Sequence, residues 1–194
     1  MRKILTRALY FILPVATWVA GVGTGYTQQP KTDSAAISLK STGGAKTADD
    51  TLKPYQKYPT LPAFNIRLAD SGTIFNTYNI PEGKPIALML FSPDCDHCKR
   101  TIKSLIKGMD SIKNIQFYLI SGYHDYGAIR EFYEKHHLGD YENIKVVGRD
   151  YEYFFIDFYK TKFVPDIALY DAHKKLIKLI EGETTANEVY KYIH

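Results

Sequence analysis

Through most of the chain, segments that are apolar almost throughout alternate with segments in which apolar residues recur at helical spacing. KPIALMLF (84–91) and NIQFYLISG (114–122) are apolar almost throughout, which is the pattern of strands covered on both faces. Between them, apolar residues recur at three- and four-residue spacing, which predicts an amphipathic helix after the first strand. The residues of that series are Ile102, Leu105, Ile106, Met109 and Ile112.

Shorter elements flank this strand–helix–strand unit. FNIRLADSGTIFNTYNI (64–80) predicts a hairpin, because two β-like runs flank an Asp-Ser-Gly turn. Thr185 and Glu188 are spaced as a capping box for a last helix. The alternation of expected strands and helices along the chain predicts an α/β fold, with a central mixed sheet, helices on both faces and an N-terminal β-hairpin extension. The remaining expected elements are helices over 127–138 and 151–160, a short strand over 144–148, and paired strands over 164–171 and 175–182.

The first 57 residues follow a different pattern. Three basic residues among the first seven precede an uncharged apolar stretch, so 1–25 is expected to be a secretory signal peptide or, if uncleaved, a membrane anchor. No cysteine follows that stretch, which excludes lipid attachment there. Residues 26–57 are polar and small, and we expect a flexible linker, because they bury too little apolar surface to offset their ordering entropy. The folded domain is then expected over 58–194, outside the cytoplasm, in the periplasm or cell envelope.

The length and net charge of the chain limit its domain organisation and the classes of molecule that it could bind. The 194 residues suit one domain with appendages, and 16 Tyr and 10 Phe can supply its core. The formal net charge of +4 is too small to argue for nucleic-acid binding. We expect a monomer that touches a membrane only through 1–25, if that segment is retained.

The chain has two cysteines, Cys95 and Cys98, in LFSPDCDHCKR (90–100). A structural disulfide would close a very small loop and stabilise the fold little. A zinc site needs four ligands, and there is no second Cys pair to complete one. The third interpretation is a redox-active dithiol. It fits best, because Cys95 follows a buried strand and opens a helix, where free N–H groups and the macrodipole favour a thiolate.

Cys98 lies one helical turn after Cys95, on the same side, and can form a disulfide with it. A Cys-x-x-Cys motif beside a β–α–β pattern is typical of redox proteins. With KPIALMLFSPDCDHC (84–98) and FVPDIALYD (163–171), the chain from about residue 61 resembles the thioredoxin fold, and specifically the TlpA/ResA-like extracytoplasmic thiol–disulfide oxidoreductases. The resemblance covers the whole expected domain.

The resemblance implies roles for individual residues. Cys95 would be the nucleophile and Cys98 the resolving thiol of a redox-active Cys95–Cys98 disulfide. Pro165 would be cis, and the backbone of Val164 would bind a substrate chain like an added strand. No cofactor is implied. The partners would be protein thiols or disulfides and a separate redox partner that supplies or accepts electrons.

Five positions depart from the usual pattern of this family or could tune the dithiol. Met89 stands where thioredoxins often carry a buried carboxylate, and Asp94 replaces a common aromatic residue. A protonated His97 would stabilise the Cys95 thiolate, whereas Asp94 and Asp96 would oppose it. Asp166, directly after the proline, is also unusual; it would lie near the dithiol or face solvent, and we expect it to face solvent.

Two other functions use similar residues. A thioredoxin-fold copper metallochaperone would bind Cu(I) through Cys95, Cys98 and a histidine such as His124, because soft thiolates suit that ion. Such proteins usually space their cysteines one residue further apart. A peroxiredoxin-like peroxidase would need a different cysteine motif, which is absent from the sequence. We therefore expect a thiol–disulfide oxidoreductase.

Overall fold

The computed structural model describes residues 51–69 and 73–193. The expected signal peptide or anchor, and the linker up to residue 50, lie outside this part. At the end of the expected linker, Pro54–Lys57 forms one helical turn, α1, and Tyr55 packs against Tyr159 at a ring-centroid distance of 6.2 Å. Within the described residues, no helix has the length and apolar character needed to span a membrane.

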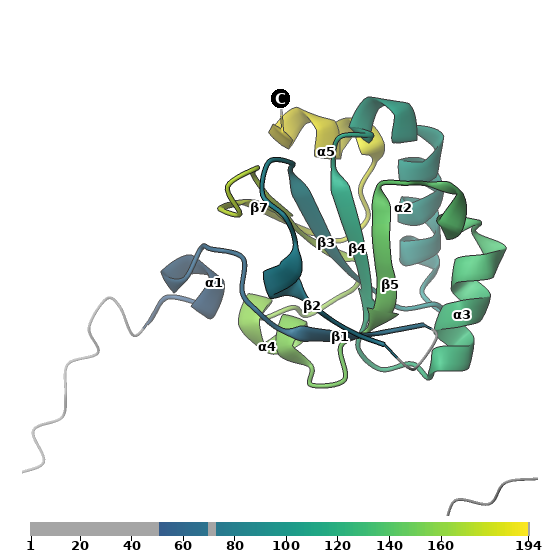
Figure 1. Cartoon of the computed structure of the whole chain (residues 1–194), viewed down its shortest axis with the longest axis horizontal. Coiled ribbons are helices and arrows are strands. Elements are labelled where there is room, and N and C mark those ends of the chain that lie inside the picture. Colours follow the sequence, from purple (N-terminus) through teal and green to yellow (C-terminus); the bar gives the residue numbers. More distant parts are fainter. Residues whose placement is uncertain (1–50, 70–72, 194) are drawn as a thin grey trace, which may run out of the picture. The chain divides into compact units, whose positions relative to one another are not determined.

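A seven-stranded mixed sheet with the order β2-β1-β5-β4-β3-β6-β7 forms the middle layer (Figure 1). The three central strands β3, β4 and β5 are parallel, while β1, β2, β6 and β7 add antiparallel pairs at the two edges. The strands are β1 Asn65–Leu68, β2 Ile74–Asn76, β3 Ile86–Phe91, β4 Gln116–Ser121, β5 Ile144–Arg149, β6 Asp166–Tyr170 and β7 Leu176–Glu181. The expected hairpin and both apolar strands are therefore confirmed.

Helices cover both faces of the sheet, as expected. The first face packs on α2 (Asp96–Lys107), α3 (Tyr126–Lys135) and α5 (Ala186–Ile193), and Met89 and Phe91 of β3 belong to this core. The second face packs on α4 (Phe154–Tyr159), with alternate β3 residues such as Leu90 (Figure 1). Full burial of β3 and β4 explains why their sequences are apolar on both faces.

Two helix ends differ in detail from the sequence pattern. The apolar series after the cysteines spans two elements, because α2 ends at Lys107 and the short 3₁₀ helix η3 (Met109–Ile112) follows. Short 3₁₀ helices η2 (Thr77–Asn79) and η4 (Leu138–Asp140) lie elsewhere. Only half of the expected capping box forms at α5. Glu188 N–H donates to the Thr185 hydroxyl at 3.2 Å, but the Glu188 carboxylate accepts from Thr184 instead.

The expectation that Asp166 faces solvent is wrong. Its side chain is fully buried, because β6 lies between β3 and β7 and pairs Asp166 with Leu90 and Glu181. Cross-strand partners share a face, so Asp166 lies on the second face with Leu90, opposite to the face that packs on α2. Burial raises the pKa of the Asp166 carboxyl to about 6, although a hydrogen bond from Thr161 opposes that shift.

A raised carboxyl pKa makes a specific prediction for stability. The folded state favours the protonated acid, so the cost of ionising Asp166 is absent below about pH 4 and fully present above about pH 6. Stability should therefore fall between these values, by about 3 kcal/mol at most. Asp166→Asn should remove that fall and raise the free energy of unfolding at neutral pH by about 1–2 kcal/mol.

Urea denaturation across this pH range tests the prediction, with the exposed Asp157→Asn as the matched control. The control should follow the natural protein at every pH. An Asp166→Asn variant that is less stable than the natural protein at neutral pH would show that the ionised carboxylate is stabilising.

Candidate active site

The two cysteines lie where β3 leads into α2. Cys95 is the N-cap of α2, and its Sγ accepts a hydrogen bond from the Cys98 N–H at 3.3 Å. The Cys95 N–H donates to the Ser92 carbonyl at 3.1 Å, which closes the turn after the strand. Both cysteines are free thiols in this structure. An N-cap acceptor that carries negative charge is favoured by the helix N–H groups, so the geometry suits a thiolate at Cys95.

The two thiols differ in exposure. Cys95 is half-buried and open to solvent on one side, whereas Cys98 is fully buried against the first face of the sheet. Burial, together with the hydrogen bond to Cys95, raises the pKa of the Cys98 thiol far above its usual range. Cys95 is therefore the accessible thiol of the pair, while burial favours the protonated form of Cys98.

The segment before β6 meets the dithiol from the other side. The Val164–Pro165 peptide bond is cis, and the Cys95 thiol points at the Val164 carbonyl oxygen at 3.5 Å. On the far side, the Gly182 N–H donates to the Pro165 carbonyl at 2.8 Å. The structure thus brings together Cys95 and Val164, which are 69 positions apart in the sequence.

Each charged side chain between the cysteines has a partner. The Asp96 carboxylate lies 3.1 Å from Lys99 Nζ, and this hydrogen bond lowers the pKa of Asp96. Glu183 accepts from Arg100 Nε at 2.9 Å and lies 3.0 Å from His97 Nδ1; hydrogen bonds from both lower the pKa of Glu183. The sequence analysis missed Glu183, because it lies after β7 and carries no signal that links it to the motif.

His97 Nδ1 faces two groups that favour opposite protonation states of this nitrogen. It lies 3.0 Å from the Glu183 carboxylate and 2.8 Å from an Arg100 guanidinium nitrogen. With a proton on Nδ1, the ring donates to Glu183; without it, the ring accepts from Arg100. In either state Glu183 stays beside His97 and Arg100, so any positive charge that a protonated His97 offers to Cys95 is largely compensated.

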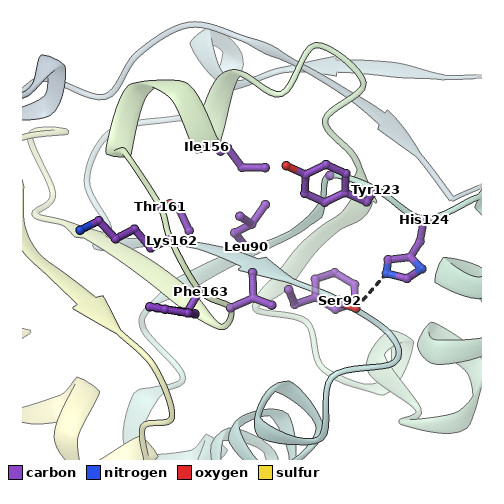
Figure 2. Close-up of a pocket in the computed structure, with 11 residues that line it drawn as sticks. Leu90, Ser92, Tyr123, His124, Ile156, Thr161, Lys162 and Phe163 are labelled. Atoms are coloured by element: carbon purple, nitrogen blue, oxygen red, sulfur yellow. Dashed lines mark hydrogen bonds between the residues drawn. The ribbon is translucent and has the colours of Figure 1, made fainter.

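A second histidine holds the turn before the cysteines. His124 Nε2 lies 2.8 Å from the Ser92 hydroxyl (Figure 2). The Nδ1 atom of the same ring lies 3.5 Å from the exposed carboxylate of Asp94. Asp94 therefore faces His124 and lies outside the cysteine pair. In the described part of the chain, no three His, Cys, Asp or Glu side chains are grouped to hold a metal ion. The histidine-assisted copper site expected as the alternative thus gains no support.

A cavity of about 380 Å³ opens beside the dithiol on the α4 side of the sheet. Its walls are mostly apolar, and Val164 contributes both to the cavity and to the contact with Cys95. Phe163 and Tyr123 stand at its rim, with 79% and 70% of their surfaces exposed. Figure 2 shows the lining side chains, which include Leu90, Ile156 and Thr161.

No carboxylate replaces the one missing at Met89 within the described residues. Met89 is buried in the same core cluster as Cys98. The two buried carboxyl groups of this part are Asp150 and Asp166. Asp150 accepts from the N–H groups of Glu152 and Phe155 and so caps α4, and Asp166 lies on the other face of the sheet.

The fold resembles solved thiol–disulfide oxidoreductases. A secreted disulfide oxidoreductase of Mycobacterium tuberculosis, homologous to E. coli DsbE, is 20% identical with a TM-score of 0.56, covering 66% of this chain and 92% of that one. StoA from Bacillus subtilis is 14% identical with a TM-score of 0.53, covering 69% and 98%. A thioredoxin-family thiol:disulfide interchange protein from Chlorobium tepidum is 15% identical with a TM-score of 0.57, covering 69% and 92%.

Sequence comparison gives the family. No curated protein matches the chain. The family model of the thioredoxin-like domain matches residues 78–194, which is more than half of the chain and includes the dithiol, the Val164–Pro165 bond and the last helix. The chain therefore belongs to the thioredoxin-like family.

Proposed function

We propose that the protein is an extracytoplasmic thiol–disulfide oxidoreductase that exchanges electrons with protein cysteines through Cys95 and Cys98. The observation that carries the proposal is the pairing of an accessible thiol at a helix N-cap with a buried thiol one turn later. The apolar stretch in 1–25 supports a location outside the cytoplasm. The similar M. tuberculosis protein is described as secreted, which agrees with this location.

The proposed reaction proceeds by two thiol–disulfide exchanges. The Cys95 thiolate attacks one sulfur of a client disulfide, and the other client sulfur leaves as a thiolate. Cys98 then loses its proton and attacks Cys95 Sγ, which releases the second client thiol. Two electrons pass to the client, and the protein is left with a Cys95–Cys98 disulfide. The same steps in reverse oxidise a client, so the potential of the redox partner sets the direction.

The Val164 segment is the proposed binding surface for the client chain. Extended peptides add to exposed backbone as an extra strand, and alternate side chains then enter neighbouring pockets. The Val164 carbonyl is 3.5 Å from Cys95 Sγ, so a chain paired there would carry its cysteine to the nucleophile. The cavity next to Val164 would accept an apolar side chain of the same client.

The difference in exposure predicts selective labelling. When the reduced protein is treated with iodoacetamide at mildly acidic pH, Cys95 should be alkylated at least about tenfold faster than Cys98, since the thiolate is the reactive form and Cys98 is buried. Peptide mapping of the alkylated protein gives both rates. Faster labelling of Cys98 would reverse the two roles.

The order of the two exchanges predicts a trapped intermediate. Cys98→Ala leaves no thiol to resolve the mixed disulfide, so disulfide-linked complexes with client proteins should accumulate on non-reducing gels of cell-envelope extracts. Cys95→Ala is the matched control and should give none. Both variants should lose insulin disulfide reduction. A natural protein that fails to reduce insulin but binds Cu(I) tightly would instead favour the metallochaperone.

Because the side chains between the cysteines already lie beside groups of opposite charge, we expect substitutions there to change the reduction potential only slightly. His97→Ala removes a side chain that stabilises the Cys95 thiolate when protonated and should make the potential more negative, whereas Asp96→Ala should make it less negative. Each shift should be below about 30 mV, a tenfold change in equilibrium constant, because Glu183 and Lys99 already compensate these charges. Equilibration with glutathione buffers measures the three potentials. A larger shift would show that the partners do not screen the thiolate.

A further inference from the structure

Asp166 is a buried acid that the exchange reaction described above does not use. Its side chain has no exposed surface, and one carboxylate oxygen accepts a hydrogen bond from the Thr161 hydroxyl at 2.5 Å. Within the described part of the chain, the other oxygen has no hydrogen-bond partner. An ionisable group placed in this way is costly to the fold, which points to a role other than stability.

The Thr161–Asp166 bond closes a short segment of chain that carries the dithiol contact. The closed segment contains Phe163, Val164 and Pro165, and the Val164 carbonyl faces Cys95 Sγ at 3.5 Å. Thr161, which Figure 2 labels, and Val164 both line the cavity described above. One hydrogen bond thus joins the two ends of the segment that presents Val164 to the nucleophile.

We propose that Asp166 is a positioning residue for exchange with polypeptide clients: it clamps the 161–166 segment through Thr161, and the strength of the clamp follows its ionisation. This inference rests on the proposed function, because it concerns how the client surface is held. A hydroxyl bonds a carboxylate roughly twice as strongly as a neutral acid. The segment is therefore held more firmly when Asp166 is charged.

The pKa of Asp166 depends on the ionisable groups around it, and the tyrosines on the same face stay neutral while Asp166 titrates. Glu181, its partner on β7, raises the pKa of Asp166, and Lys53, just before α1, lowers it; both effects are smaller than that of burial, which brings the pKa to about 6. On the same face, the hydroxyls of Tyr159 in α4 and Tyr170 in β6 bond to each other. Burial raises the pKa of both phenols, so they stay neutral while Asp166 titrates.

The proposed clamp predicts that the KM for polypeptide substrates depends on pH in a way that the reduction of small disulfides does not. Insulin must pair with the Val164 segment, whereas hydroxyethyl disulfide is too small to need it. For the natural protein, the KM for insulin should fall about threefold to tenfold between about pH 5 and about pH 7, as the clamp tightens. The rate with hydroxyethyl disulfide should follow the thiolate fraction alone.

Two variants and one control test this, with dithiothreitol as the reductant. Asp166→Asn keeps the shape but cannot ionise, so its KM for insulin should stay at the low-pH value at every pH. Thr161→Val keeps the acid but removes the donor, and it should also raise KM at neutral pH; it decides the question if Asp166→Asn does not fold. Asp157→Asn alters an exposed acid of α4 and should behave as the natural protein.

The outcomes separate the inference from the proposed function. A natural protein that reduces neither substrate would overturn the proposed function. If both are reduced but Asp166→Asn keeps the natural pH dependence of KM, the positioning role is wrong. The role is also wrong if Asp166→Asn slows insulin and hydroxyethyl disulfide equally, because such a loss would reflect general damage to the dithiol.

Discussion

The antiparallel register between β3 and β6 is the constraint on which the site depends. It pairs Met89 with Ile167 and Leu90 with Asp166, and so places the end of β3, where the dithiol turn begins, beside the cis proline at the start of β6. Because side chains alternate along a strand, a slip of one residue would exchange the two faces. Asp166 would then lie toward α2 and Cys98, and Ile167 would move to the second face. The first face is an apolar core, so the cost of placing the Asp166 carboxyl there opposes such a slip and fixes the distance between Cys95 and Val164.

Given that register, backbone groups act on the dithiol more than side-chain charges do. The side chains with charge around the motif are compensated locally: Asp96 by Lys99, and His97 and Arg100 by Glu183. What remains aimed at Cys95 Sγ is the Cys98 N–H at the start of α2 and the Val164 carbonyl opposite. A thiolate gains from the first of these, while a thiol can donate to the second. Cys95 Sγ is thus in contact with two backbone segments, α2 and the segment before β6, whose positions the sheet determines.

The sequence predicted what depends on neighbours in the chain. The hairpin, the buried strands and the cysteine pair at a helix start all follow from local spacing, and each is confirmed. The contacts that shape the site join residues far apart, such as Ser92 with His124 and His97 with Glu183, and no periodicity marks them. Asp166 was misplaced for a related reason. A charged residue after a proline suggests a solvent-facing turn, and only the pairing of β6 with strands on both sides shows that the position is interior.

In the proposed reaction, the absence of a carboxylate at Met89 affects the second exchange, because Cys98 must lose its proton there. Cys98 and Met89 belong to the same apolar core cluster, and burial raises the pKa of the Cys98 thiol. The other groups that affect its pKa are the Cys95 side chain, which raises it, and the backbone N–H groups of Ser92 and Cys98, which lower it, and no carboxylate is among them. When Cys95 is tied to a client, its sulfur no longer carries charge, so the repulsion that disfavours a Cys98 thiolate disappears while the desolvation cost remains. In the proposed reaction, the second exchange would therefore require a proton to leave a buried site. The mixed disulfide at Cys95 would then outlast the first exchange, and the contacts proposed at Val164 would hold the client until Cys98 attacks.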